Sequence, residues 1–143
     1  MSTRIDYDGE IITAVAEGPV SGGAWVKAGS YTSTVTADSK AQYAATKIKV
    51  QNGASGMTYP VGLSLFAVAS GTNNLVSCLT QGLIIAPVNG ALDPAASAGR
   101  VSAVDNGAGQ VGVLTAGANG ADIIGTALTP AASGGFAIVH FRL

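Results

Sequence analysis

The chain has 143 residues, of which 48% are hydrophobic and 10% are charged, and its formal net charge at pH 7 is -1. This length fits one domain with a substantial core. Charged residues usually make up about a quarter of a globular protein, so we expect partner molecules to cover much of this weakly charged surface. Because no basic cluster could follow a phosphate backbone, nucleic acid is not an expected partner.

The sequence contains no segment suited to crossing or entering a membrane. Its longest apolar runs, Leu63 to Ala69 and Leu83 to Val88, are much shorter than the roughly 18 residues of a spanning helix. The amino terminus, MSTRIDYDGE, lacks the apolar centre and the cleavage site of a secretory signal. We therefore expect no membrane partner and no export through that route.

Residues 1–9 are polar and show no apolar periodicity, which predicts an amino-terminal arm outside the core. Ile5 and Tyr7 are apolar side chains in this otherwise soluble tail. An extended arm of this kind can add a strand to the exposed sheet edge of a neighbouring molecule. The alternative is a frayed terminus without a role. The predicted docking residues are Arg4, Ile5, Asp6, Tyr7 and Asp8.

Residues 10–143 are predicted to form a single β domain. The chain has 20 glycines, and short β-branched or aliphatic runs recur between them, as in short strands joined by turns. One short helix, Asp38 to Thr46, is favoured by a capping box formed by Ser39 and Gln42. The predicted strands are Glu10 to Ala16, Ala24 to Lys27, Thr32 to Thr36, Lys47 to Gln51, Gly62 to Ala69, Leu75 to Leu79, Leu83 to Pro87, Arg100 to Val104, Val111 to Leu114, Ile123 to Ala127 and Phe136 to Leu143.

The last strand has the clearest alternation, because Ala137, Val139, Phe141 and Leu143 share one face. We expect that face to meet the core. The fold class is therefore predicted to be all-β, built from short strands with Gly-rich turns and at most one short helix.

An internal echo relates two loops, ALDPAASAG at Ala91 to Gly99 and ALTPAASGG at Ala127 to Gly135. Each has a proline at the same place and ends in glycine before a strand, so the same backbone path is predicted for both. Leu92 and Leu128 are expected to anchor the two loops in the core. The alternative is chance similarity between two Ala-rich stretches.

The few motifs that could carry chemistry are better explained by structure. Gly107, Gly109 and Gly112 form a GxGxxG string, but the glycines that follow would break the helix that a dinucleotide site needs. A Gly-rich hairpin or turn is the preferred interpretation, and no cofactor is expected. His140 is the sole histidine, and no local motif supplies a nucleophile and an orienting carboxylate for it.

No metal site is expected either. The only cysteine, Cys78, is predicted to be a small buried hydrophobe. Asp6, Asp8 and Glu10 alternate and could hold a hard cation, but a solvated acidic edge is preferred, since calcium requires six or more oxygens in a curved loop. We predict no catalytic residue and no enzymatic activity.

The sequence from Gly82 onward resembles the small capsid cement or decoration proteins of tailed phages. The matching pieces are a Gly-led apolar strand, a strand of the R-V-S-A-V kind, a D-x-G turn, an I-G-x-A-L segment, an A-A-S-x-G turn and a closing alternating strand. They correspond here to Gly82 to Pro87, Arg100 to Val104, Asp105 to Gly107, Ile124 to Leu128, Ala131 to Gly135 and Ala137 to Leu143. The resemblance covers about 60 residues, and the first half of the chain is too variable to align.

This resemblance implies a small, compact β-barrel or β-tulip subunit, usually a homotrimer, that binds the outside of an icosahedral phage head and bridges major capsid proteins. The protein would then reside on the outer capsid surface of the virion, after a period in the host cytoplasm. No catalytic residue or cofactor is implied. The alternative is a β-sandwich module of a phage fibre or surface structure that binds a receptor or carbohydrate. An exposed row of aromatic side chains would favour that alternative.

Overall fold

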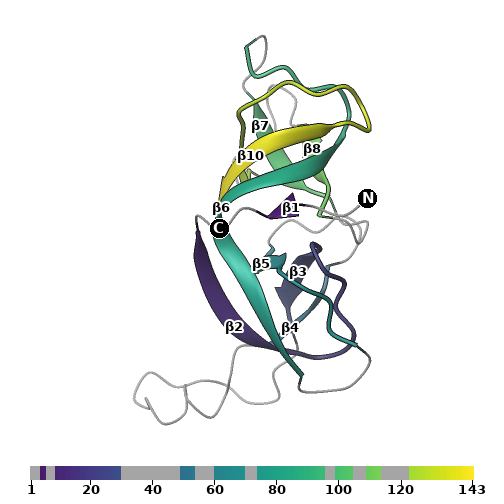
Figure 1. Ribbon diagram of the computed structural model, residues 1–143, viewed down its shortest axis with the longest axis vertical. Coiled ribbons are helices and arrows are strands. Elements are labelled where there is room, and N and C mark those ends of the chain that lie inside the picture. The colour runs from purple at the N-terminus through teal and green to yellow at the C-terminus, as the bar shows by residue number, and fades with distance from the viewer. Residues whose placement is uncertain are drawn as a thin grey trace.

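The computed structural model describes residues 4–5, 9–29, 49–53, 60–69, 74–95, 99–104, 109–113 and 123–143. Every regular element in these ranges is a β-strand, which confirms the all-β class (Figure 1). The predicted helix and the strand predicted over 32–36 lie outside the described residues. The strands are β1 Arg4–Ile5, β2 Glu10–Ala16, β3 Trp25–Ala28, β4 Lys49–Asn52, β5 Gly62–Ser64, β6 Asn74–Asn89, β7 Arg100–Ala103, β8 Val111–Val113, β9 Gly125–Ala127 and β10 Phe136–Arg142.

The long strand β6 runs through the whole molecule and joins its two halves (Figure 1). Two separate strands were predicted here, with a break between Leu79 and Leu83, and that prediction is wrong. Gln81 pairs with Glu10 of β2 and with Arg142 of β10, so hydrogen bonding continues through the expected break. Gly82 has a φ of +150°, a conformation that side chains disfavour, which lets the strand pass from one half to the other without ending.

Strand pairing closes twice, once on each half of β6. In the lower half of Figure 1, the pairs run from β6 to β2, β4, β3, β5 and back to β6. In the upper half, they run from β6 to β8, β7, β9, β10 and back to β6. All the strands, including β1, belong to one mixed hydrogen-bonded sheet. We call these closed sets the first and the second circuit.

The two circuits have the same topology. In each, taken in chain order, the first strand pairs antiparallel with the fifth and parallel with the third. The second pairs antiparallel with the third and the fourth, and the fourth with the fifth. β6 is the fifth strand of the first circuit and the first strand of the second. The fold is therefore an internal duplication that shares one strand.

The registers of the two circuits match as well. Val26 pairs with Gly62 in the first circuit as Val101 pairs with Gly125 in the second. Outside the strands, the isolated bridge between Val20 and Val68 corresponds to the bridge between Leu92 and Ala131. These agreements assign a counterpart in the second circuit to each paired residue of the first.

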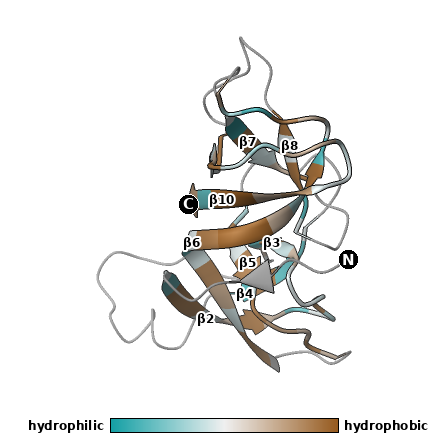
Figure 2. Cartoon of the chain, turned by 45° about the horizontal axis from the view of Figure 1, so that its top comes forward, coloured by the Kyte–Doolittle hydropathy of each residue, from teal (hydrophilic) through white to brown (hydrophobic). Residues whose placement is uncertain are grey.

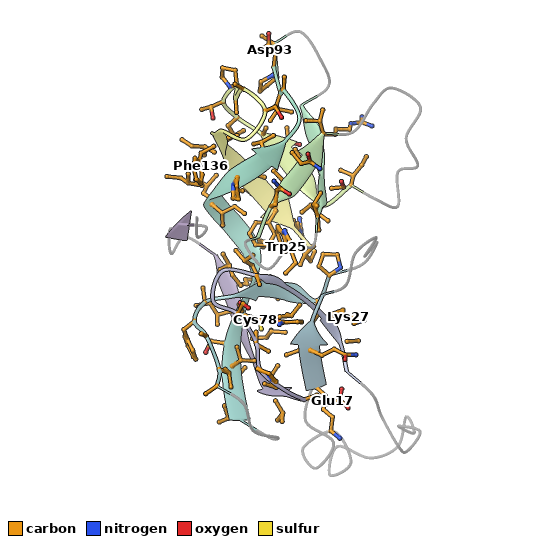
Figure 3. All side chains as sticks on the ribbon, turned by 90° about the vertical axis from the view of Figure 1, so that its right-hand side faces the viewer. Glu17, Trp25, Lys27, Cys78, Asp93 and Phe136 are labelled. Atoms are coloured by element: carbon orange, nitrogen blue, oxygen red, sulfur yellow. The ribbon has the colours of Figure 1, made fainter. Side chains whose placement is uncertain are left out.

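Side chains from the two circuits form two buried clusters. The smaller lies within the first circuit and contains, among others, Val26, Val76 and Cys78. The larger is built mainly from the second circuit, but Trp25, Leu63 and Leu79 of the first circuit belong to it. Trp25 lies between the two halves (Figure 3). The first circuit therefore buries part of its outer surface against the second.

The predicted loop echo does not describe equivalent structures. Leu92 is buried, whereas Leu128 is 55% exposed, so only the first of the two leucines anchors its loop in the core. Gly99 has a positive φ, while in the second loop Gly134, not Gly135, has one. Leu92 and Ala131 instead hydrogen-bond to each other, at 2.8 and 2.9 Å. The similarity of these two loops is compositional, and the true repeat relates other residues.

No helix in the described ranges has the length and hydrophobicity needed to cross a membrane.

Candidate docking surfaces

The predicted docking arm is partly described. Its backbone at Arg4–Ile5 forms β1, which pairs antiparallel with Ile84 and Ile85 of β6. Because the same two isoleucines pair with β10, β1 occupies the opposite edge of β6. β1 thus adds to a sheet edge within its own chain. Asp6, Tyr7 and Asp8 lie outside the described residues, and their role in docking stays a prediction.

A second candidate surface is the outer face of β9 and β10. Alternation along β10 follows the prediction: Ala137, Val139 and Phe141 are buried, and Ile138 and His140 are exposed. Leu143, expected on the buried face, is 43% exposed at the chain end. The outward side chains of β10 continue onto those of β9 and the turn that follows it.

Leu128 and Ile138 are adjacent on this face. The amide of Leu128 donates to the carbonyl of Ile138 at 2.8 Å, and their side chains are 55% and 39% exposed. Across β10, Ile138 pairs with Ile85 and His140 pairs with Leu83, both partly exposed. In Figure 2 the ribbon of β6 beside β10 is coloured brown, as expected for a run of hydrophobic residues. Sequence analysis missed the patch because it assigned Leu128 to the core.

The GxGxxG string does not precede a helix in this fold. Gly109 has a φ of +64° and comes before β8, and Gly112 lies within β8. β7 and β8 pair antiparallel, which confirms the interpretation as part of a hairpin. Gly107 lies outside the described residues. This arrangement lacks the helix amino terminus that binds a pyrophosphate.

His140 is exposed on β10, opposite Thr126 of β9. In the described part of the chain, no three His, Cys, Asp or Glu side chains come together in a way that could hold a metal ion. Asp6 and Asp8, two of the three acidic residues that were considered above as a cation site, lie outside that part. Glu10 is exposed, and its carbonyl accepts a hydrogen bond from the Thr80 hydroxyl at 3.1 Å.

Cys78 is fully buried, which confirms its prediction as a core residue. Burial raises its pKa from 9.0 to about 11, because the apolar surroundings disfavour the thiolate. The side chain lies in the lower half of the molecule in Figure 3. A thiol in this environment is protected from reagents that attack the thiolate.

We expect the stability of the protein to fall between pH 9 and pH 11 through Cys78. The folded state holds the thiol proton more tightly than the unfolded state, so this contribution is complete below pH 9 and is lost as the pH rises through the folded pKa. The loss is about 2–3 kcal/mol at most. Urea denaturation from pH 8 to pH 11 measures it, with Cys78→Ala as the control that should show a shallower decline. Equal slopes for both proteins would contradict the assignment.

The fold is similar to that of a phage head protein of known structure. The N base of the head fiber gp8.5 of bacteriophage phi29 matches with a TM-score of 0.56 and 13% sequence identity, over 93% of this chain and 93% of that chain. No protein-family model matches the sequence, and no curated protein matches it significantly. The resemblance of the carboxy-terminal motifs to cement and decoration proteins is therefore not accompanied by a match to a family model or to a curated protein. What this chain shares with the head fiber base is its fold, along nearly the whole length of both.

Proposed function

We propose that this protein is a non-enzymatic structural component of a phage particle that binds the outside of the icosahedral head. The observation that carries the proposal is the similarity in fold to a head fiber base over 93% of both chains. The carboxy-terminal motifs point the same way. The small charged fraction, 10%, suits a surface that is largely covered by other molecules in an assembly.

In the assembled particle the protein stabilises the head by bridging major capsid proteins, and it acts as a homotrimer. Bridging requires contacts with two capsid subunits at once, and a trimer multiplies each weak contact without requiring a new one. The alternative, a receptor- or carbohydrate-binding module, called for an exposed row of aromatic side chains. Among the described residues, Phe66 is the one exposed aromatic side chain. The described residues thus present no row of exposed Phe, Tyr or Trp, and the four tyrosines of the chain lie outside them.

The test is co-sedimentation of the purified protein with empty heads assembled from the cognate major capsid protein. We expect the protein to sediment with the heads and to raise the temperature at which the heads disassemble. Expanded and unexpanded heads should be compared, because a bridging protein depends on the spacing between capsid subunits. Failure to bind either form would overturn the proposal. If the protein binds heads without raising their disassembly temperature, the proposed attachment stands and the proposed bridging role is wrong.

Deleting residues 1–8 is expected to weaken attachment to heads by roughly tenfold or more, about 1.4 kcal/mol. The melting temperature should change little, because the described part of the arm pairs with β6 only at Arg4–Ile5. Removing residues 1–3 alone, which retains β1, is the matched control and should bind heads normally. Equal binding by the longer deletion would place the head contact outside the arm.

A further inference from the structure

The duplication shows which outer faces of the two circuits correspond. In the first circuit, Trp25, Leu63 and Leu79 lie in one row across β3, β5 and β6. The row at the same register positions in the second circuit crosses β7, β9 and β10, and it consists of Arg100, Thr126 and His140. The two rows therefore mark the same face of two equivalent units.

The two faces differ in what covers them. Trp25, Leu63 and Leu79 are at most 1% exposed, because the second circuit packs over them. Leu65, beside this row, is partly buried against the same cluster. In the second circuit, by contrast, all three residues of the row are exposed, and the counterpart of Leu65 is the exposed Leu128. Within one chain, this face is thus covered once and left open once.

We propose that the open face of the second circuit, formed by Arg100, Thr126, Leu128, Ile138 and His140, is the surface through which one copy of this chain binds a second copy. The first reason is the precedent inside the chain, where a unit of this same fold covers the equivalent face. The second is the pair of adjacent apolar side chains, Leu128 and Ile138, which remain exposed on it and which a partner would remove from water.

The difference in residue type between the two faces supports a contact between separate molecules. The face buried within the chain is never exposed to water in the folded protein, so it can consist of tryptophan and leucine. A face that joins two copies must stay soluble before assembly, and such interfaces combine an apolar centre with a polar rim. Arg100, Thr126 and His140 supply that polar part, and arginine is among the residues enriched at interfaces.

The test is the oligomeric state of the isolated full-length protein, measured by sedimentation velocity at several concentrations. Ile138→Lys, alone and combined with Leu128→Glu, should shift the protein from oligomer to monomer, with the melting transition of the separated monomer still cooperative. Leu75→Glu is the matched control, because Leu75 is 58% exposed at the start of β6 in the first circuit, on strand positions away from this face. That variant should assemble as the wild type does.

This inference deepens the proposed homo-oligomer, and its failure can be told apart from failure of the proposed function. If the wild-type protein is a monomer at every concentration, both the oligomer and the face are wrong. If the wild type is an oligomer that both Ile138→Lys and the double variant preserve, only the face is wrong. If the variants remain oligomeric but no longer sediment with heads, the face binds capsid protein and the proposal is overturned. If the wild-type protein is an oligomer that does not bind heads at all, the proposed function is wrong, but the proposed interface between copies is unaffected.

Discussion

Replacing Trp25 with alanine is expected to lower the free energy of unfolding by about 3–5 kcal/mol. Trp25 is 1% exposed and joins the two circuits. Its ring meets that of Phe141 edge to face, with centroids 5.3 Å apart and planes at 88°, a favoured geometry for an aromatic pair. Its Nε1–H also donates to the carbonyl oxygen of Gln110 at 3.0 Å. Alanine would remove all these contacts and leave a cavity between the halves.

A second variant separates the ring from the hydrogen bond. Trp25→Phe keeps an aromatic ring and loses the donor, but the Gln110 carbonyl still accepts from the amide of Val104 at 2.8 Å. We therefore expect a smaller loss, about 1–2 kcal/mol. Phe66→Ala, at a 49% exposed aromatic, is the control and should cost less than either. Because Trp25 is the only tryptophan, circular dichroism must follow unfolding in all variants. Equal losses at Trp25 and Phe66 would contradict the role assigned to Trp25.

Strand positions could be predicted where side chains alternate between core and solvent. The strand over residues 136–143 was placed almost correctly, because the polar His140 and Arg142 alternate with the apolar Val139 and Phe141. The continuity of β6 could not be predicted. A glycine between two apolar runs looks like a turn, and only the partners of Gln81 on both edges show that the strand continues.

The duplication was hidden from sequence for a physical reason. Strand pairing is made by backbone groups, so equivalent positions can hold very different side chains, as Trp25 and Arg100 or Leu79 and His140 do. Their environments also differ, because one face is covered by the other circuit and its counterpart is open. The visible echo aligns Leu92 with Leu128, whereas in the fold these two loops pair with each other through the bridge between Leu92 and Ala131. The open face of the second circuit was missed for the same reason, since only the repeat shows that Leu128 corresponds to a covered leucine.

The two circuits have the same residue type, glycine, at Gly62 and Gly125, where the backbone leaves no room for a side chain. These glycines occupy the same position in β5 and β9, opposite Val26 and Val101. A Cβ on Gly62 would lie 2.8 Å from the Cβ of Cys78 and 3.0 Å from the carbonyl oxygen of Leu79. At Gly125 it would overlap the carbonyl oxygen of His140 and lie 2.8 Å from the Cα of Phe141. In both circuits, the glycine lets the fourth strand approach the fifth closely.

Gly125→Ala is accordingly expected to lower the free energy of unfolding by about 1–3 kcal/mol or more. The effect should lie at the upper end, because the obstructing atoms belong to the backbone of a paired strand and can move only if β9 and β10 separate. Gly62→Ala should cost less, because its closest approach, 2.8 Å to the Cβ of Cys78, is a milder overlap than the one at Gly125. Gly18→Ala is the control: no atom lies within 4 Å of the added methyl group, so its effect should stay within about 0.5 kcal/mol. Urea denaturation of the three variants measures these differences. If Gly125→Ala were as stable as Gly18→Ala, β9 and β10 could not approach as closely as this register requires, and the correspondence between Gly62 and Gly125 would lose its steric explanation.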